Sequence, residues 1–312
     1  MLVQEAAERV ISNVERVIVG KREVIELAFV ALLCEGHILV EDVPGTGKTA
    51  LAKAIARSLG CTFQRIQFTP DLLPSDVTGV YVYNQKEQTF EYRPGPIMAQ
   101  IVLADEINRA TPRTQAALLE AMQERQVSVD RETKVLPRPF LVLATQNPIE
   151  LEGTFPLPEA QIDRFLMRIQ LGYPSEEQEN DILLRFEQDD PLQSLQPVLD
   201  DQALLALQHD VRSIRVEESV RHYVVRMARA TRDHPSVELG VSPRGTLALY
   251  KTSQALAAAR GRDYVIPDDV KYLAPFVLIH RLMISPQTRL RGRSAVQVLL
   301  EVVDSVPVPV ET

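Results

Sequence analysis

The stretch EDVPGTGKTA (41–50) contains residues whose types and order suit the binding of a phosphate group. Gly47, Lys48 and Thr49 match the end of a known pattern, which is glycine, four residues of any kind, and then Gly-Lys-Ser/Thr. The apolar run HILV (37–40) before it has the length of a strand, and the residues after it show helical spacing of apolar side chains. Because the pattern requires a strand, a glycine-rich turn and a helix in this order, we expect a loop that holds nucleotide phosphates.

The expected chemistry rests on the backbone of this loop and on the start of the helix that follows. The amides from Gly45 to Thr49 and the helix N-terminus together form a concave site for an anion. Lys48 supplies a positive charge for the outer phosphates, and the hydroxyl of Thr49 can ligate Mg²⁺. We therefore expect ATP and Mg²⁺ as ligands. The expected nucleotide-binding segment is Pro44, Gly45, Thr46, Gly47, Lys48, Thr49 and Ala50.

Asp42 stands where the pattern has its first glycine. This position lies at the end of the strand, before the loop curls, so the amides from Gly45 to Thr49 are complete without it. A carboxylate that pointed at the phosphates would repel them. We therefore interpret Asp42 as a side chain that points away, and we expect glycine at this position to leave nucleotide affinity nearly unchanged or slightly higher.

A second acidic motif follows in IVLADEIN (101–108), where an apolar strand ends in Asp105 and Glu106. Carboxylates at the carboxyl end of a parallel strand lie at the same edge of the sheet as the phosphate loop. Asp105 can hold Mg²⁺ through water, and Glu106 can orient and deprotonate an attacking water. The alternative is a pair of acidic turn residues. Together with the phosphate loop, the motif predicts hydrolysis of ATP.

Three further polar residues are candidates for the same chemistry, each with an ordinary alternative. Asn147 ends the strand-like run FLVLATQNP and can hold the attacking water, or it belongs to an Asn-Pro turn. Arg164 lies on a helix that we predict to start at Pro158, and it is a surface ion-pair member or an arginine that reaches a neighbouring subunit's nucleotide. Arg244 lies on the first turn of a helix, where the helix dipole disfavours a positive charge. It either contacts a bound phosphate, which would explain this placement, or is solvated.

Taken in order, PGTGKT, VLADEINRA, ATQNP, EAQIDRF and VSPRG resemble the MoxR family of AAA+ ATPases, in its helix-2-insert branch. The resemblance covers nearly the whole chain. It implies an α/β fold with a parallel-sheet AAA+ core and flanking helices in residues 1–172, and an all-helical lid in residues 173–312. It also implies that Val19 and Gly20 lie against the adenine. The roles that it implies elsewhere are catalysis by Glu106, Asn147, Arg164 and Arg244, and metal binding by Thr49 and Asp105.

Two segments of the chain are expected to form hairpins. In VSVDRETKVLP (127–137), apolar and polar residues alternate on both sides of a turn at DRET, which is typical of a hairpin. The resemblance implies another hairpin within residues 68–97, the insertion of this AAA+ branch. In ring ATPases of this kind such hairpins face the pore or the partner.

Length and composition agree with a cytoplasmic two-domain protein. The chain has 312 residues, and single cores stop growing at roughly 250–300 residues. The net charge of −8 argues against a general nucleic-acid binder. No apolar run approaches the ~20 residues of a membrane span, and the N-terminus lacks the features of a signal peptide. Cys34 and Cys61 have no CxxC spacing, so we expect plain thiols.

Three readings of the function compete. The first is an ATP-driven chaperone or remodeller of partner proteins, which the resemblance implies to act as a ring, most often a hexamer, with a von Willebrand factor A domain protein as a partner. The second is a motor of another kind, either for nucleic acid or as a subunit of a metal chelatase. The acidic composition favours the first and predicts no stable binding of nucleic acid. A scaffold that binds nucleotide without turnover is a third reading, which Glu106 opposes.

Overall fold

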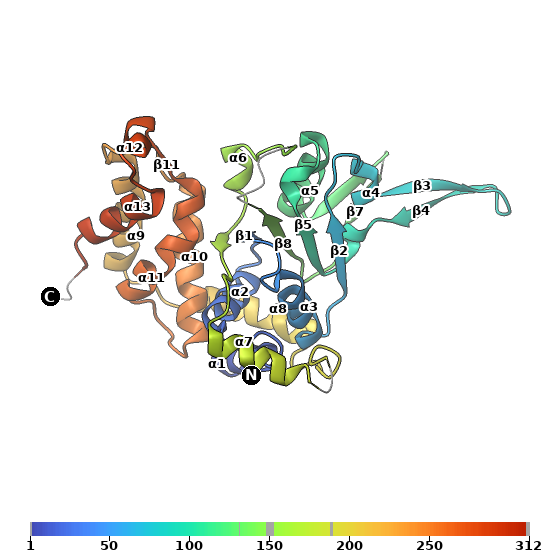
Figure 1. Ribbon diagram of the computed structural model, residues 1–312, viewed down its shortest axis with the longest axis horizontal. Coiled ribbons are helices and arrows are strands. Elements are labelled where there is room, and N and C mark those ends of the chain that lie inside the picture. Colours follow the sequence, from blue (N-terminus) through green and yellow to red (C-terminus); the bar gives the residue numbers. More distant parts are fainter. Residues whose placement is uncertain (1, 131, 148–152, 188–189, 310–312) are drawn as a thin grey trace.

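The chain folds into an α/β core with a helical lid on one side and a long hairpin that projects on the other (Figure 1). The computed structural model describes residues 2–130, 132–147, 153–187 and 190–309. The predicted fold class, a parallel-sheet core followed by a helical lid, is confirmed.

A parallel sheet forms the centre of the core. In the described part of the chain its strand order is β2-β5-β8-β1-β9. The bounds of the strands are β1 (Ile38–Glu41), β2 (Phe63–Gln67), β5 (Ile101–Asp105), β8 (Leu141–Gln146) and β9 (Met167–Ile169). Since β8 pairs with both β1 and β5, the carboxyl ends of these three strands lie side by side at one edge of the sheet.

Both faces of the sheet are covered, as the apolar strands require. Successive side chains of a strand point to opposite faces, so Ile38 and Val40 of β1 join one hydrophobic cluster and Leu39 joins another. The first cluster packs under α1 (Val3–Glu15), α2 (Arg22–Leu33) and α3 (Lys48–Ser58), and the second under α5 (Pro112–Glu124). The phosphate loop and α3 are thereby fixed against a rigid layer.

Both expected hairpins are present. The first consists of β3 (Gly79–Asn84) and β4 (Thr89–Pro94), follows the short helix α4 (Pro74–Thr78), and projects far from the core (Figure 1). The second consists of β6 (Gln126–Val129) and β7 (Glu132–Val135) and follows α5 directly.

One helix prediction is wrong in its extent. The helix expected from Pro158 is α6 (Glu159–Ile162), and Arg164 lies in the turn after it rather than on it. The helix ends because the next residues must enter the sheet. The side chain of Phe165 is fully buried, and the amide of Leu166 donates to the carbonyl of His37, directly before β9 begins.

The described part of the lid is mainly helical and contains a small antiparallel pair, β10 (Val237–Leu239) with β11 (Met283–Ile284). Helix α10 (Pro243–Ala259) follows the N-cap Ser242, whose hydroxyl accepts from the amide of Gly245, so Arg244 lies on its first turn as predicted. Helix α10 packs against α1, α2 and α11 (Pro267–Leu278). The helices of the C-terminal part are α7 (Glu176–Arg185), α8 (Asp201–Asp210), α9 (Glu218–Asp233), α10 (Pro243–Ala259), α11 (Pro267–Leu278), α12 (Pro286–Leu290) and α13 (Ala295–Ser305). Among the described residues, the short 3₁₀ helices are η1 (Pro96–Met98), η2 (Ile107–Arg109), η3 (Val211–Ser213) and η4 (Ile279–Arg281).

The division of the chain at residues 172 and 173 remains a prediction. One hydrophobic cluster contains residues from the sheet, from α1 to α3 and from the helices after residue 195, so the lid packs on the core over a continuous apolar contact.

Within the described residues, no helix is long and apolar enough to cross a membrane. Cys34 and Cys61 are half-buried free thiols, as expected. Burial raises the pKa of each thiol to about 12, so both are protonated at neutral pH.

Candidate nucleotide site

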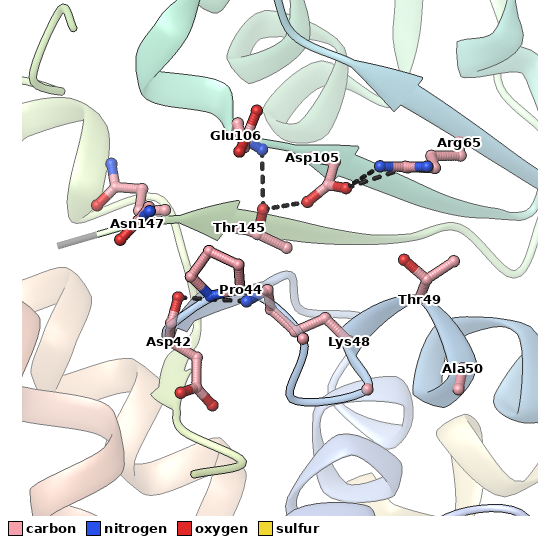
Figure 2. Close-up of a pocket in the computed structure, with 13 residues that line it drawn as sticks. Asp42, Pro44, Lys48, Thr49, Ala50, Arg65, Asp105, Glu106, Thr145 and Asn147 are labelled. Atoms are coloured by element: carbon pink, nitrogen blue, oxygen red, sulfur yellow. Dashed lines mark hydrogen bonds and ion pairs between the residues drawn. The ribbon is translucent and has the colours of Figure 1, made fainter. Parts of the chain in front are cut away.

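A cavity of about 470 Å³ opens at the carboxyl end of the sheet (Figure 2). This volume lies within the range of ligand pockets in proteins, roughly 300–1,000 Å³. Predicted residues in its lining are Pro44, Gly45, Gly47, Lys48, Thr49, Ala50, Asp105, Glu106 and Asn147. The lining also contains Asp42, Arg65, Thr145 and Gln146.

The phosphate loop connects β1 directly to α3. Gly45 and Gly47 have φ angles of +86° and +94°, a conformation that side chains rarely adopt, and Gly47 stands immediately before the first helical residue. The Lys48 ammonium donates to the carbonyl of Val43 at 2.6 Å and to that of Asp42 at 3.2 Å. The loop thus presents backbone amides and a lysine at a helix N-terminus, which is the arrangement that suits polyphosphate.

The Asp42 carboxylate points away from the loop, as the sequence suggested (Figure 2). One oxygen accepts from the amide of Val43 at 2.9 Å. The other accepts from the amides of Leu171 and Gly172 at 2.8 and 2.7 Å. Residues 171 and 172 follow β9, where the chain leaves the sheet toward the lid. Asp42 therefore ties the start of the phosphate loop to the exit of the core, and this contact explains an acidic residue in place of glycine.

Asp105 lies at the end of β5 and is largely buried. One carboxylate oxygen accepts from the hydroxyl of Thr145 at 2.6 Å. The other accepts from the Arg65 guanidinium, at 3.0 Å from Nε and 2.6 Å from Nη2. Figure 2 shows Arg65 reaching Asp105 from the neighbouring strand β2. The Asp105 carboxylate is thus held in one orientation, with one oxygen on Thr145 and the other on the Arg65 guanidinium.

Glu106 has a left-handed backbone with a φ angle of +56°, which is uncommon for a residue other than glycine and occurs often at functional sites. Its amide donates to the hydroxyl of Thr145 at 2.8 Å. Its carboxylate accepts from Gln67 at 2.7 Å and from Arg109 at 3.1 Å. The side chain is therefore held at the cavity by polar contacts from two elements, while its backbone turns the chain sharply after β5.

The donor set fits a nucleotide-bound magnesium ion. Within the described residues, no group of three or more His, Cys, Asp or Glu side chains is arranged to hold a metal alone. Mg²⁺ is usually held by one or two protein oxygens together with substrate phosphates and water. Thr49 and Asp105 line the same cavity, so they could supply the protein oxygens once phosphates supply the others.

Five predicted site residues lie outside this lining. The Thr46 hydroxyl donates to the carbonyl of Val43 within the loop. Val19 is buried, and Gly20 has a φ angle of +67° and lies against Gln178 of α7. Their proposed contact with adenine remains a prediction.

The two predicted arginines are also outside the cavity lining. Arg164 donates from Nη1 to the carbonyl of Leu119 on α5 at 3.1 Å, so it points into its own core. Arg244 pairs with Asp163 at 3.7 Å, across the contact between lid and core. An acidic partner therefore provides one reason for a cation on the first turn of α10, in addition to the bound phosphate that we expect.

Arg65, Gln67 and Thr145 are site residues that sequence reasoning missed. Arg65 and Gln67 alternate with the buried Ile66 at the end of β2, and Gln67 stands opposite Asp105 in the sheet. The polar residues in the short strand FQRIQ were the signal, but only the strand order places that strand beside β5.

A parallel sheet with a glycine-rich phosphate loop and an acidic pair at one edge, followed by a helical lid, defines the class of AAA ATPases. Residues 37–167 match the model of the ATPase family associated with various cellular activities (AAA), and residues 229–302 match an AAA lid domain. The chain is 47% identical to the chaperone MoxR1 of Mycobacterium tuberculosis over 89% of this chain and 76% of that protein. The chain therefore belongs to the MoxR family of AAA ATPases.

Two further similarities agree with this assignment. The chain is 54% identical to the Bacillus subtilis protein YeaC over 97% of this chain and 95% of that protein. The solved structure of a candidate ATPase from Cytophaga hutchinsonii superposes with a TM-score of 0.92 and 36% identity, covering 98% of this chain and 96% of that one.

Proposed function

We propose that this protein is a Mg²⁺-dependent ATP hydrolase that acts as a chaperone or remodeller of partner proteins. The observation that supports hydrolysis most directly is one cavity that contains Lys48, Thr49, Asp105 and Glu106. The chaperone part rests on the similarity to a relative named as a chaperone. A von Willebrand factor A domain protein is the partner that we propose, on the basis of the family resemblance.

The residues of the cavity divide the work between binding and proton transfer. Amides of the loop and Lys48 would hold the phosphates, while Thr49 and Asp105 would hold Mg²⁺, which when bound neutralises phosphate charge. Glu106 would accept a proton from the attacking water, and Asn147 would help to orient that water. The polar contacts of Gln67 and Arg109 keep the Glu106 carboxylate in position for this role.

Substitution of Glu106 and of Lys48 separates hydrolysis from binding. Glu106→Gln is expected to bind ATP but to turn over about a hundredfold to ten-thousandfold more slowly, since it loses the general base. Lys48→Ala is expected to bind ATP poorly. Glu120→Gln on α5 and Lys53→Ala on α3 replace exposed side chains and serve as matched controls. A steady-state ATPase assay measures the turnover of each variant, and nucleotide titration measures its affinity for ATP. Hydrolysis by Glu106→Gln at the wild-type rate would disprove the assignment.

We further propose that the active species is a ring, most simply a hexamer, in which Arg164 serves the next subunit's site. Arg164 does not line the cavity of its own protomer. Protomers that pack head to tail form a heterologous contact, which closes into a ring when the rotation permits. An arginine supplied in this way stabilises transition-state charge and is worth roughly a thousandfold or more in rate.

Mixing two inactive variants tests this arrangement. Arg164→Ala and Glu106→Gln are each expected to be inactive alone. A mixed ring contains interfaces with an intact Glu106 on one side and an intact Arg164 on the other, so ATPase activity should return. Absence of recovery in rings shown to be mixed would contradict the role of Arg164, and a monomer at saturating ATP would contradict the ring.

A further inference from the structure

The turn that carries Arg164 is held by the lid of the same protomer. Arg281, at the end of η4, is almost fully buried and donates from Nε to the Asp163 carboxylate at 2.8 Å. Its Nη1 donates to the carbonyl of Leu166 at 3.1 Å, and its Nη2 donates to the carbonyls of Asp163 and Phe165. Lid contacts therefore fix the chain on both sides of Arg164.

The Asp163 carboxylate has two more partners on the lid. The hydroxyl of Ser242, at the N-cap of α10, donates to its two oxygens at 3.0 and 3.2 Å. The guanidinium of Arg244, two residues later, lies 3.7 Å from one of them. A single carboxylate of the core thus contacts three lid side chains, and one of them is Arg244, which we expect to contact a bound phosphate.

Arg164 itself is incompletely satisfied in this position. Its Nη1 reaches the carbonyl of Leu119, but its Nε is buried without a hydrogen-bond partner among the described residues. Buried polar groups are nearly always paired, so an exception calls for an explanation. A second, outward position of the guanidinium toward a neighbouring subunit provides one.

We propose that Asp163 is a positioning residue through which the lid of one protomer sets the position of Arg164, and hence the rate of hydrolysis in the next subunit's site. This proposal rests on the proposed role of Arg164 across the interface. A phosphate that draws Arg244 away from Asp163 leaves Ser242 and Arg281 as the lid side chains that hold the carboxylate, and so resets the position of the turn. Nucleotide in one site thereby affects its neighbour.

Complementation in mixed rings tests the proposal. Asp163→Asn keeps the shape of the side chain but removes its charge, so the pure ring should lose at least about tenfold in ATPase rate, part of the roughly thousandfold that the arginine is worth. Mixed with Glu106→Gln, whose Arg164 is intact, it should recover activity. Mixed with Arg164→Ala, it should not. The exposed Glu159→Gln on α6 is the matched control for loss of charge in the same segment.

Other patterns overturn the proposal. Wild-type activity of Asp163→Asn would show that Asp163 does not set the rate. Recovery with Arg164→Ala, or no recovery with Glu106→Gln, would show that Asp163 acts on its own site or only on folding. If Asp163→Asn does not assemble, the milder Ser242→Ala, which removes only the hydroxyl contact, is put through the same mixtures and read by the same criteria. The mixture of Arg164→Ala with Glu106→Gln reports separately on the proposed function.

Discussion

Substitution of Asp42 should lower stability without lowering nucleotide affinity. The carboxylate accepts hydrogen bonds from the amides of Val43, Leu171 and Gly172, and the residue is 8% exposed. None of these contacts is made to the part of the loop that is expected to hold phosphate. The informative variants are Asp42→Ala, Asp42→Asn and Asp42→Gly.

The expected magnitude follows from these contacts. A hydrogen bond to a charged group contributes about 1.5–3 kcal/mol, and a buried donor left without a partner costs a similar amount, so Asp42→Ala should lower the free energy of unfolding by about 4 kcal/mol. Asp42→Asn keeps one acceptor oxygen, and a loss of about 1–2 kcal/mol is expected. Asp42→Gly should lose slightly more than Asp42→Ala, by up to about 1 kcal/mol, because glycine gains backbone freedom in the unfolded chain.

Guanidinium denaturation and titration with a fluorescent ATP analogue measure the two effects separately. The order of midpoints should be wild type, then Asp42→Asn, then Asp42→Ala, then Asp42→Gly, while the affinity for nucleotide stays nearly constant under conditions where all variants are folded. The exposed Asp71→Ala is the control for loss of a carboxylate. The reasoning is refuted if Asp42→Gly is as stable as wild type, or if it stays folded but loses most of its affinity for ATP.

Two further predictions concern Arg65 and His37. Arg65 is about half exposed, so its ion pair with Asp105 is worth at most about 1 kcal/mol. Arg65→Gln releases Asp105 from this pair and leaves its carboxylate to Mg²⁺. ATP should therefore bind up to about fivefold more tightly in Mg²⁺, relative to the change measured in EDTA. A loss of affinity would instead place Arg65 on the phosphates. Burial lowers the pKa of His37 from 6.5 to about 4, so the unfolded chain takes up a proton first as the pH falls. Between pH 6.5 and 4, the free energy of unfolding of wild type should therefore fall by roughly 3 kcal/mol more than that of a His37→Gln variant. Denaturation at a series of pH values measures both, and an equal dependence of the two free energies on pH would contradict the prediction.

The parts of the site that the sequence predicted are those that local patterns determine. The glycines, Lys48 and Thr49 lie within one strand–loop–helix unit, and Asp105 and Glu106 end an apolar strand. Parallel strands bring their carboxyl ends to one edge, so two local motifs were enough to predict one cavity.

The parts that were missed depend on which strands and domains become neighbours. Thr145 contacts Asp105 and Glu106 because β8 pairs with β5, and Arg65 reaches Asp105 because β2 pairs with β5 on its other side. The end of α6 was misplaced for a similar reason. Helical start signals are local, whereas the end of α6 is imposed by the buried Phe165 and the entry into β9.

The two aspartates that sequence reasoning left without a partner, Asp42 and Asp163, connect the core to the lid side of the chain. Asp42 fixes residues 171 and 172, where the chain leaves the core, and Asp163 fixes Ser242 and Arg281 of the lid. Their shortest contacts are 2.7 and 2.8 Å, and hydrogen bonds weaken steeply when their geometry is lost. A shift of the partner segment by about 1 Å or more would therefore break such contacts rather than stretch them. Packed contacts of this kind favour discrete positions over graded ones. The phosphate loop would then respond to a movement of residues 171 and 172, where the chain leaves the core, and the turn carrying Arg164 to a movement of the lid.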